Sequence, residues 1–384
     1  MKVVLAIDSL KGSLSSLEAG EAIKNGVLKA IPGANVIVRP LADGGEGTVE
    51  TLALGMGGKL ESVDVTGPLG EKVTCLYGIL EKSKTAIIEM SGAAGITLVP
   101  DAKRNPLNTT TYGVGEVIKD AISKGCRHFI VGIGGSATND GGIGMLQALG
   151  YGILDKDGNQ VPFGAKGLKE IAAITDEHVI PELKNCSFRI ACDVTNTLCG
   201  EFGCSAVFGP QKGADPTMII QMDEWLADYA KLTSEKYEKA DATYPGTGAA
   251  GGMGFAFLAY TNAVLESGIK IILEETNLES YVKDSDIVVT GEGRLDGQTV
   301  FGKAPIGVAN IAKKYNKTVL AFAGAVTEDA IACNEHGIDA FFPILRRIQT
   351  LQEAMEPSIA RKNMASTVEQ IFRLINAKHC IFQE

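Results

Sequence analysis

Short apolar runs alternate with segments of helical period near the N-terminus, and this alternation restricts the fold more than any other feature. KVVLAID at 2–8 has the continuous apolar character of a buried strand, and a second strand is expected at 35–40. Ser15, followed three residues later by Glu18, predicts a capping box at the start of the helix between these strands. A further helix is expected over about 48–54. Strands that alternate with helices usually form a parallel sheet, so the pattern predicts an α/β fold.

The same alternation returns in the C-terminal part of the chain, which ends in a helix expected near 358–376. Helical stretches separate the four strands that the apolar runs predict there. These strands are expected near 269–273, 286–290, 318–323 and 338–343.

The middle of the chain has a different pattern. ESVDVT at 61–66, KVTCLYGI at 72–79 and TAIIEM at 85–90 are strand-like runs separated only by short turns. Because no crossover helix fits between them, they predict antiparallel pairing. Further buried strands are expected at 128–133 and 187–194.

These patterns predict a two-domain α/β protein. A doubly wound, Rossmann-like parallel-sheet domain is expected from both chain ends, 1–60 and 265–384. Residues 61–264 are expected to form an inserted mixed α/β domain, with an active site in the cleft between the two.

Composition excludes several other classes. The net charge is −10 and is spread along the chain, which argues against nucleic acid or an anionic membrane as partner. The eight cysteines form no CxxC pair, and the four histidines give no zinc spacing. The start MKVVLAIDS lacks the features of a signal peptide, and the uncharged run 242–265 contains Pro245 and several glycines, which predict a loop and a buried helix. We therefore expect a cytoplasmic protein with reduced cysteines and leave open whether it forms a homo-oligomer.

The segments that follow the predicted strands are rich in glycine and acidic residues. In parallel α/β sheets, ligands bind beyond the carboxyl ends of the strands, where helix N-termini offer unpaired N–H groups. Every one of five predicted strand ends carries a glycine cluster or an acidic residue. These segments are 8–13, 42–48, 134–142, Asp193 and 291–296.

Such segments suit a phosphate, because glycines let backbone N–H groups approach it closely. Carboxylates beside a phosphate require a divalent cation between them, which favours Mg²⁺, and one carboxylate can instead take a proton from an attacking hydroxyl. Basic side chains are present to neutralise phosphates or a substrate carboxylate. The acidic candidates are Asp43, Glu46, Asp193, Glu292 and Asp296, and the basic ones are Lys11, Arg104, Arg294 and Lys303.

Two motifs imitate other nucleotide sites. Residues 132–137 fit a loose G-x-G-x-x-A dinucleotide fingerprint, but Asp155, the acidic partner, lies in the turn-like sequence DKDGN. Residues 297–303 imitate a Walker A loop, but Ala304 stands where Ser or Thr should hold the magnesium. Neither motif predicts its usual ligand.

Taken together, these segments resemble the bacterial glycerate kinases of the type-1 family. The resemblance covers essentially the whole chain, and none of the motifs is disrupted in this sequence. It is carried by AIDSLKGSLSS at 6–16, PLADGGEGT at 40–48, RNPLNTTTYGVGE at 104–116, IGGSATNDGGIGMLQALG at 133–150, ACDVTN at 191–196, FGPQKGA at 208–214, GTGAAGGMGFA at 246–256 and VVTGEGRLDGQTVFGKAP at 288–305.

The resemblance implies a two-domain α/β enzyme that transfers the γ-phosphoryl of ATP to D-glycerate, gives 2-phosphoglycerate, and requires Mg²⁺. On the residues themselves we base the hypothesis that Asp193 is the general base and Lys11 a second catalytic group. The expected magnesium ligands, direct or through water, are Asp43, Glu292 and Asp296. The expected substrate- or phosphate-binding residues are Ser9, Gly44, Gly45, Arg104, Gly134, Gly135, Ser136, Asn139, Arg294 and Lys303.

Three alternatives remain at this level. A kinase of another small hydroxy acid would use the same residues. A two-lobed solute-binding protein would also close α/β domains over a ligand, although that class is normally exported. A dehydrogenase would use the glycine fingerprint.

Overall fold

The computed structural model describes residues 1–42 and 47–381, with side chains described to residue 377. The chain is an α/β protein that divides into two compact units, Met1–Asp43 with Ile269–Glu384 and Gly44–Gly268. The expected boundaries at 60 and 265 differ from these, because α2 (Thr48–Gly55) belongs to the second unit. Within the described residues, no helix combines the length and the apolar character needed to cross a membrane.

The first unit contains a five-stranded sheet in the order β13-β12-β11-β1-β2, and all of its pairs are parallel. The parallel sheet expected from the two chain ends is therefore present. Its strands are β1 (Lys2–Leu5), β2 (Asn35–Val38), β11 (Ile287–Leu295), β12 (Thr318–Val326) and β13 (Ala340–Pro343).

The prediction of a strand at 269–273 is wrong. This segment lies in the helix α9 (Gly268–Glu275). A Cβ on Gly307 would lie 2.9 Å from Leu273 and 3.0 Å from Ile269, so these two residues, four apart, share one helical face. A short apolar run fits a buried strand and a buried helix equally well, which explains the error.

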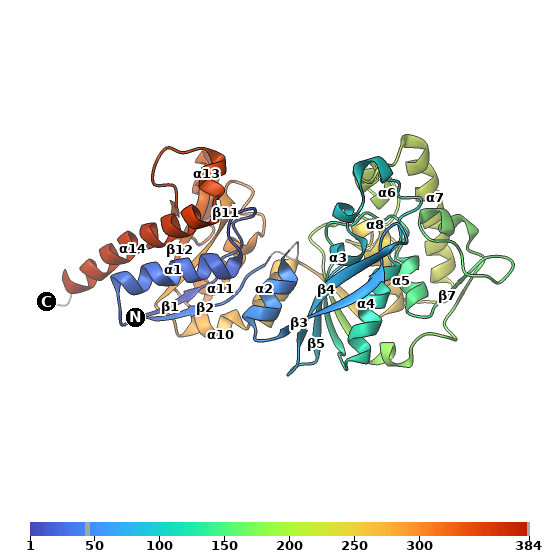
Figure 1. Ribbon diagram of the computed structural model, residues 1–384, viewed down its shortest axis with the longest axis horizontal. Helices are drawn as coiled ribbons and strands as arrows, with labels where there is room; N and C mark the ends of the chain where they lie inside the picture. Colours follow the sequence, from blue (N-terminus) through green and yellow to red (C-terminus); the bar gives the residue numbers. More distant parts are fainter. Residues whose placement is uncertain (43–46, 382–384) are drawn as a thin grey trace. The chain divides into compact units, whose positions relative to one another are not determined.

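Two helices pack on each other and on one face of this sheet (Figure 1). α1 (Ser16–Ala30) begins with the expected capping box of Ser15 and Glu18, and it packs along α14 (Pro357–Ile381). A Cβ on Gly26 would lie 2.5 Å from the carbonyl oxygen of Ala365, so the two helices approach closely where this side chain is missing. Their apolar side chains form one core with β1, β11 and β12.

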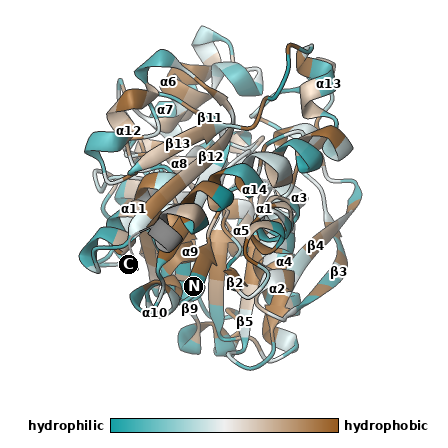
Figure 2. Cartoon of the chain, turned by 90° about the vertical axis from the view of Figure 1, so that its left-hand side faces the viewer, coloured by the Kyte–Doolittle hydropathy of each residue, from teal (hydrophilic) through white to brown (hydrophobic). Residues whose placement is uncertain are grey.

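The remaining helices of this unit include α11 (Ala304–Lys314), which contacts β11 and β12. In Figure 2 the strands β11 and β12 are largely hydrophobic, whereas hydrophilic residues gather on the surrounding helices and loops. The shorter helices are α10 (Leu278–Lys283), α12 (Ala332–Glu335) and α13 (Leu351–Met355).

The second unit contains a mixed six-stranded sheet in the order β10-β9-β6-β5-β4-β3. The antiparallel pairing predicted for the middle of the chain is confirmed for β3 with β4 and for β4 with β5, whereas β5, β6, β9 and β10 pair in parallel. The strands are β3 (Lys59–Thr66), β4 (Lys72–Leu80), β5 (Thr85–Glu89), β6 (His128–Gly132), β9 (Ser187–Ala191) and β10 (Ala263–Glu266), and a separate antiparallel pair is formed by β7 (Gly152–Leu154) and β8 (Ala173–Thr175).

Several helices of the second unit pack against the long loop between β6 and α5. In α8, Gly251 and Gly252 have positive φ, and a Cβ on Gly251 would lie 2.1 Å from the carbonyl oxygen of Thr138. The backbone of α8 therefore lies directly against this loop. Besides α2, the helices of this unit are α3 (Ser91–Ala94), α4 (Tyr112–Ser123), α5 (Ile143–Ala148), α6 (Cys204–Phe208), α7 (Pro216–Ser234) and α8 (Ala249–Tyr260).

Candidate active site

In the first unit, the residues that follow β1 lie beside the end of β11. The two strands are parallel neighbours, and the N–H of Asp8 donates to the carbonyl oxygen of Gly291 at 2.9 Å. A Cβ on Gly293 would lie 3.5 Å from the backbone nitrogen of Lys11. The segment with Asp8, Ser9 and Lys11 therefore runs along the expected phosphate segment at 291–296.

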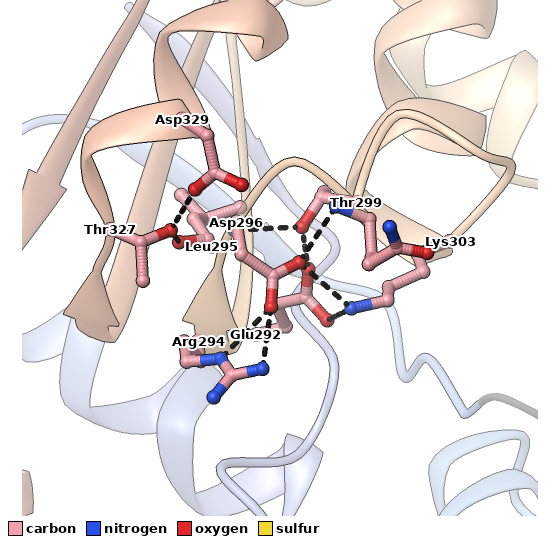
Figure 3. A network of polar contacts seen from close by, with 9 residues as sticks. Glu292, Arg294, Leu295, Asp296, Thr299, Lys303, Thr327 and Asp329 are labelled. Carbon is pink, nitrogen blue, oxygen red and sulfur yellow. Dashed lines mark hydrogen bonds and ion pairs between the residues drawn. The ribbon is translucent and has the colours of Figure 1, made fainter.

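β11 extends to Leu295, further than the expected end near 290, and this extension organises the site. Alternate residues of a strand share one face, so Glu292 and Arg294 project on the same side as Asp296. Arg294 donates to Oδ2 of Asp296 from Nε at 2.9 Å (Figure 3). The sequence pattern did not predict this arrangement because it placed all three residues in a loop.

A hydroxyl and a lysine join the two carboxylates. Thr299 Oγ1 donates to Oε1 of Glu292 at 2.7 Å and accepts from the backbone N–H of Asp296 at 3.2 Å. Lys303 Nζ lies 3.4 Å from Oδ1 of Asp296 and 3.8 Å from Oε2 of Glu292 (Figure 3). We call Glu292, Arg294, Asp296, Thr299 and Lys303 the β11 network.

The β11 network affects its two carboxyl groups in opposite directions. Burial raises the pKa of Glu292 and outweighs the hydrogen bond from Thr299 and the charges of Lys303 and Lys11. Burial also disfavours the ionised form of Asp296, but Arg294 and Lys303 together hold the pKa of this carboxyl below its usual value. Glu292 is thus the carboxyl of the pair that gains most from another cation.

The expected magnesium site is only partly within the described structure. Asp43, Gly44, Gly45 and Glu46 lie outside the described residues. Among the residues that are described, no three His, Cys, Asp or Glu side chains cluster as a metal site would require.

In the second unit, the segment after β6 is exposed at one end and buried at the other. Gly134 and Gly135 are exposed, and Ser136 is 8% exposed. Asn139 is fully buried, and its amide nitrogen donates to Ser205 Oγ at 2.9 Å. Asn139 therefore lies inside the second unit, where α8 packs its glycines against this half of the loop, and its expected role at a ligand stays a prediction.

The sequence pattern did not predict two buried charged side chains at this segment, Lys212 and Asp140. Lys212 Nζ donates to Ser136 Oγ at 2.9 Å and to the carbonyl oxygen of Thr138 at 2.6 Å, and burial lowers the pKa of Lys212 to about 8. Asp140 accepts from the N–H and the hydroxyl of Thr111, each at 2.9 Å, and burial raises its pKa. The signals were a lysine inside the glycine-flanked FGPQKGA and an aspartate inside a glycine-rich motif.

Of the other two expected residues of the second unit, Arg104 is half-buried and Asp193 is exposed. Arg104 forms an ion pair with Asp101 at 2.7 Å, and its carbonyl oxygen would be 2.2 Å from a Cβ on Gly213, beside Lys212. Asp193 follows β9, is exposed, and accepts from the N–H of Gly268 at 3.0 Å through Oδ1.

The dinucleotide alternative lacks its acidic partner. Oδ1 of Asp155 accepts from the backbone N–H groups of Asp157 and Asn159, each at 2.9 Å, within the exposed turn that DKDGN predicts. A ribose-binding carboxylate would instead follow the second parallel strand of a βαβ unit.

Carboxylates and cations at the carboxyl ends of parallel strands, together with a glycine-rich segment after a buried strand, define an α/β enzyme of the phosphotransferase class. The family model described as the glycerate kinase family matches residues 3–376. The chain belongs to the glycerate kinase family. It is an ATP-dependent kinase that acts on an alcohol group, and the dehydrogenase and solute-binding alternatives are set aside.

Individual relatives match over almost the full length. The chain is 47% identical to the glycerate kinase of Haemophilus influenzae, over 98% of this chain and 100% of the relative. It is 48% identical to the glycerate 2-kinase of Escherichia coli K12, over 96% and 98%. A crystal structure provisionally assigned as glycerate kinase 2 of Salmonella typhimurium LT2 superposes with a TM-score of 0.92 at 46% identity, covering 99% of each chain.

Proposed function

We propose that this chain is a glycerate 2-kinase, which transfers the γ-phosphoryl of ATP to the C2 hydroxyl of D-glycerate and releases 2-phosphoglycerate and ADP. The observation that carries the proposal is the 48% identity, over 96% of this chain, to a relative named glycerate 2-kinase. A cytoplasmic location is part of the proposal, since the seven described cysteines are free thiols.

The attacking hydroxyl requires a proton acceptor, and we assign this role to Asp193. It is exposed just after β9, and the hydrogen bond from the N–H of Gly268 limits the rotation of its carboxylate. An aspartate in this position takes the hydroxyl proton as the oxygen attacks phosphorus.

Each unit contributes cationic or backbone donors for the substrates. In the first unit, Lys11, Arg294 and Lys303 neutralise phosphate charge, and Ser9 adds a hydroxyl. In the second unit, Gly134 and Gly135 present backbone N–H groups without side-chain obstruction, and Arg104 steadies an anion. The first unit is doubly wound in this proposal, supported by α1 and α14 on one face of its sheet and by the contacts of α11 with β11 and β12.

Glu292 fits a magnesium ligand better than Asp296 does. Lys303 Nζ lies 3.8 Å from its Oε2, beyond hydrogen-bond distance, and burial disfavours the charge of Glu292 without a further cation. Both oxygens of Asp296 are engaged, by Arg294 and by the N–H of Gln298, so Asp296 acts through water or through its cations. When bound, Mg²⁺ neutralises charge on the β- and γ-phosphates.

The test is ADP release from Mg-ATP with D-glycerate, followed by phosphorus NMR of the product. Turnover on the order of 1–100 s⁻¹ with a 2-phosphoglycerate resonance supports the proposal. A 3-phosphoglycerate resonance would change the assigned hydroxyl. No turnover with either enantiomer, but turnover with another hydroxy acid such as tartronate, would replace the substrate and keep the reaction class.

A further inference from the structure

Lys212 is a buried ammonium group without a carboxylate partner. It ends the short turn Pro210–Lys212 and is 3% exposed. Its two hydrogen-bond acceptors, Ser136 Oγ and the carbonyl oxygen of Thr138, are neutral, and among the described side chains no carboxylate forms an ion pair with it. A buried charge whose hydrogen-bond acceptors are all neutral is unfavourable, so this lysine requires an explanation.

The ammonium group fixes the direction in which Ser136 can donate. A protonated lysine has three N–H donors and no acceptor, so the oxygen of Ser136 must accept from Lys212. The hydroxyl proton of Ser136 therefore points away from Lys212. Ser136 retains 8% exposure and directly follows the exposed Gly134 and Gly135, so an anion at that surface can receive this proton as a hydrogen bond.

A neighbouring atom points to the same conclusion. Thr138 Oγ1 is buried and has no hydrogen-bond partner among the described residues, so its hydroxyl also has a proton to donate. Buried polar atoms are paired in nearly all native structures. The polar groups around Lys212 are therefore not satisfied by the chain alone.

We propose that Lys212 is the positioning residue of an oxyanion subsite, in which the hydroxyl of Ser136 and the backbone N–H groups at Gly134 and Gly135 bind one oxyanion of a substrate. The oxyanion is the carboxylate of the hydroxy acid or a phosphate of the nucleotide. Lys212 does not touch the ligand; it orients and polarises Ser136 and adds positive potential below the segment. This inference rests on the proposed function.

The test is a double-mutant cycle of Lys212→Met and Ser136→Ala, with kcat and both KM values measured at pH 7. Each single variant should raise one KM by about tenfold or more, since a hydrogen bond to a charged ligand is lost. The KM of the double variant should lie within about twofold of the higher KM of the two single variants, because both changes remove the same donor. An effect on the KM of D-glycerate identifies the carboxylate, and one on the KM of ATP identifies the phosphate.

Lys166→Met is the matched control, since Lys166 is a half-buried lysine of the same unit whose ammonium group donates to Oδ1 of Asn108. Its KM values should equal those of the wild type. Fluorescence of Trp225, the single tryptophan, which lies in α7, reports whether the second unit is folded. Unchanged KM values in folded Lys212→Met, or effects that multiply in the double variant, would overturn the inference.

Two further measurements cover the remaining cases. If Lys212→Met does not fold, the affected KM should rise above pH about 8 in the wild type and stay flat in Ser136→Ala; Asp140 and the thiol of Cys204 are the titratable groups that act on Lys212. If the wild type turns over no glycerate, the proposed function fails by itself, and calorimetric titration with inorganic phosphate and with D-glycerate tests the subsite. Binding that is lost in Ser136→Ala supports it, and binding of neither probe to the wild type overturns it.

Discussion

The strand ends of the two units hold their charges in different ways. In the β11 network two cations face two carboxylates, and Arg294 keeps 66% of its side chain exposed. Beside the segment 134–142 that follows β6, Lys212 and Asp140 are both buried, and each is hydrogen-bonded by neutral donors or acceptors. Water and neighbouring charges can replace a lost partner in the first case but not in the second. Single substitutions should therefore have larger effects in the second unit than in the β11 network.

The largest effect is expected at Asp193, the single carboxylate that we place at the end of β9. Replacing Asp193 by Asn keeps the shape and the acceptor for the N–H of Gly268 but removes the proton acceptor. If it is the general base, kcat should fall by about 10²–10⁴ with the KM of ATP little changed. Steady-state kinetics measure this, and a kcat within about tenfold of the wild type would exclude the role.

Asp140→Ala should give the largest loss of stability. It leaves the N–H and hydroxyl of Thr111 and the N–H of Gly142 without their acceptor in a fully buried place. Loss of such a buried group costs about 3 kcal/mol. Urea unfolding followed by Trp225 fluorescence measures the change.

Asp155→Ala is its matched control. Asp155 also accepts two backbone N–H groups, at 2.9 Å each, but in an exposed turn. Water can replace those bonds, so the loss should stay below about 1 kcal/mol. Equal losses in the two variants would show that burial does not separate the two regions as we argue.

The sequence predicted most of the fold because the strands and helices at both chain ends have clear periods. It also identified the strand-end segments, since glycines and carboxylates after apolar runs are visible without coordinates. It did not predict Lys212, because the burial of a lysine depends on packing between segments far apart in the chain, here 136–138 and 210–213. It placed Glu292 and Arg294 in a loop because glycines flank them, whereas pairing with β12 extends the strand to Leu295.

The stability of the second unit should depend on pH through Lys212. Its folded pKa of about 8 is below the ordinary value of 10.5, so between these values the unfolded chain binds more protons, and this group makes stability rise with pH. Buried tyrosines such as Tyr151 and Tyr260, whose pKa values burial raises, act in the opposite direction. The difference in unfolding free energy between the wild type and Lys212→Met therefore isolates the contribution of the lysine.

Urea midpoints from Trp225 fluorescence at pH 7 to 10 provide this difference. The free energy of unfolding of the wild type should rise relative to that of Lys212→Met as the pH increases above about 8. Asp140 and Cys204, the groups that act on Lys212, are present in both proteins. A difference that stays constant with pH would mean that the lysine is not held in a buried, destabilised charged form.

The smallest effects are expected in the β11 network. Arg294→Ala or Lys303→Ala removes one of two cations near Asp296, and an exposed ion pair contributes at most about 1 kcal/mol, so each single loss should stay below that. Removing both leaves Asp296 and Glu292 without a nearby cation of the network. The double variant should therefore lose about 0.5–1 kcal/mol more than the sum of the singles. Urea unfolding followed by far-UV circular dichroism provides all four values.

Stability measured at acid pH is a second test of the β11 network. The cations hold the pKa of Asp296 below its ordinary 3.8, so their stabilisation is complete above that value and is lost as the pH falls through the lower folded pKa. The stability gap between the wild type and the double variant should then close below pH 3.8. A gap that persists in acid would show that the cations act by packing rather than by charge. If the losses of unfolding free energy in the two single variants add up to that of the double variant, the two cations act independently. The two units would then not differ in the way proposed.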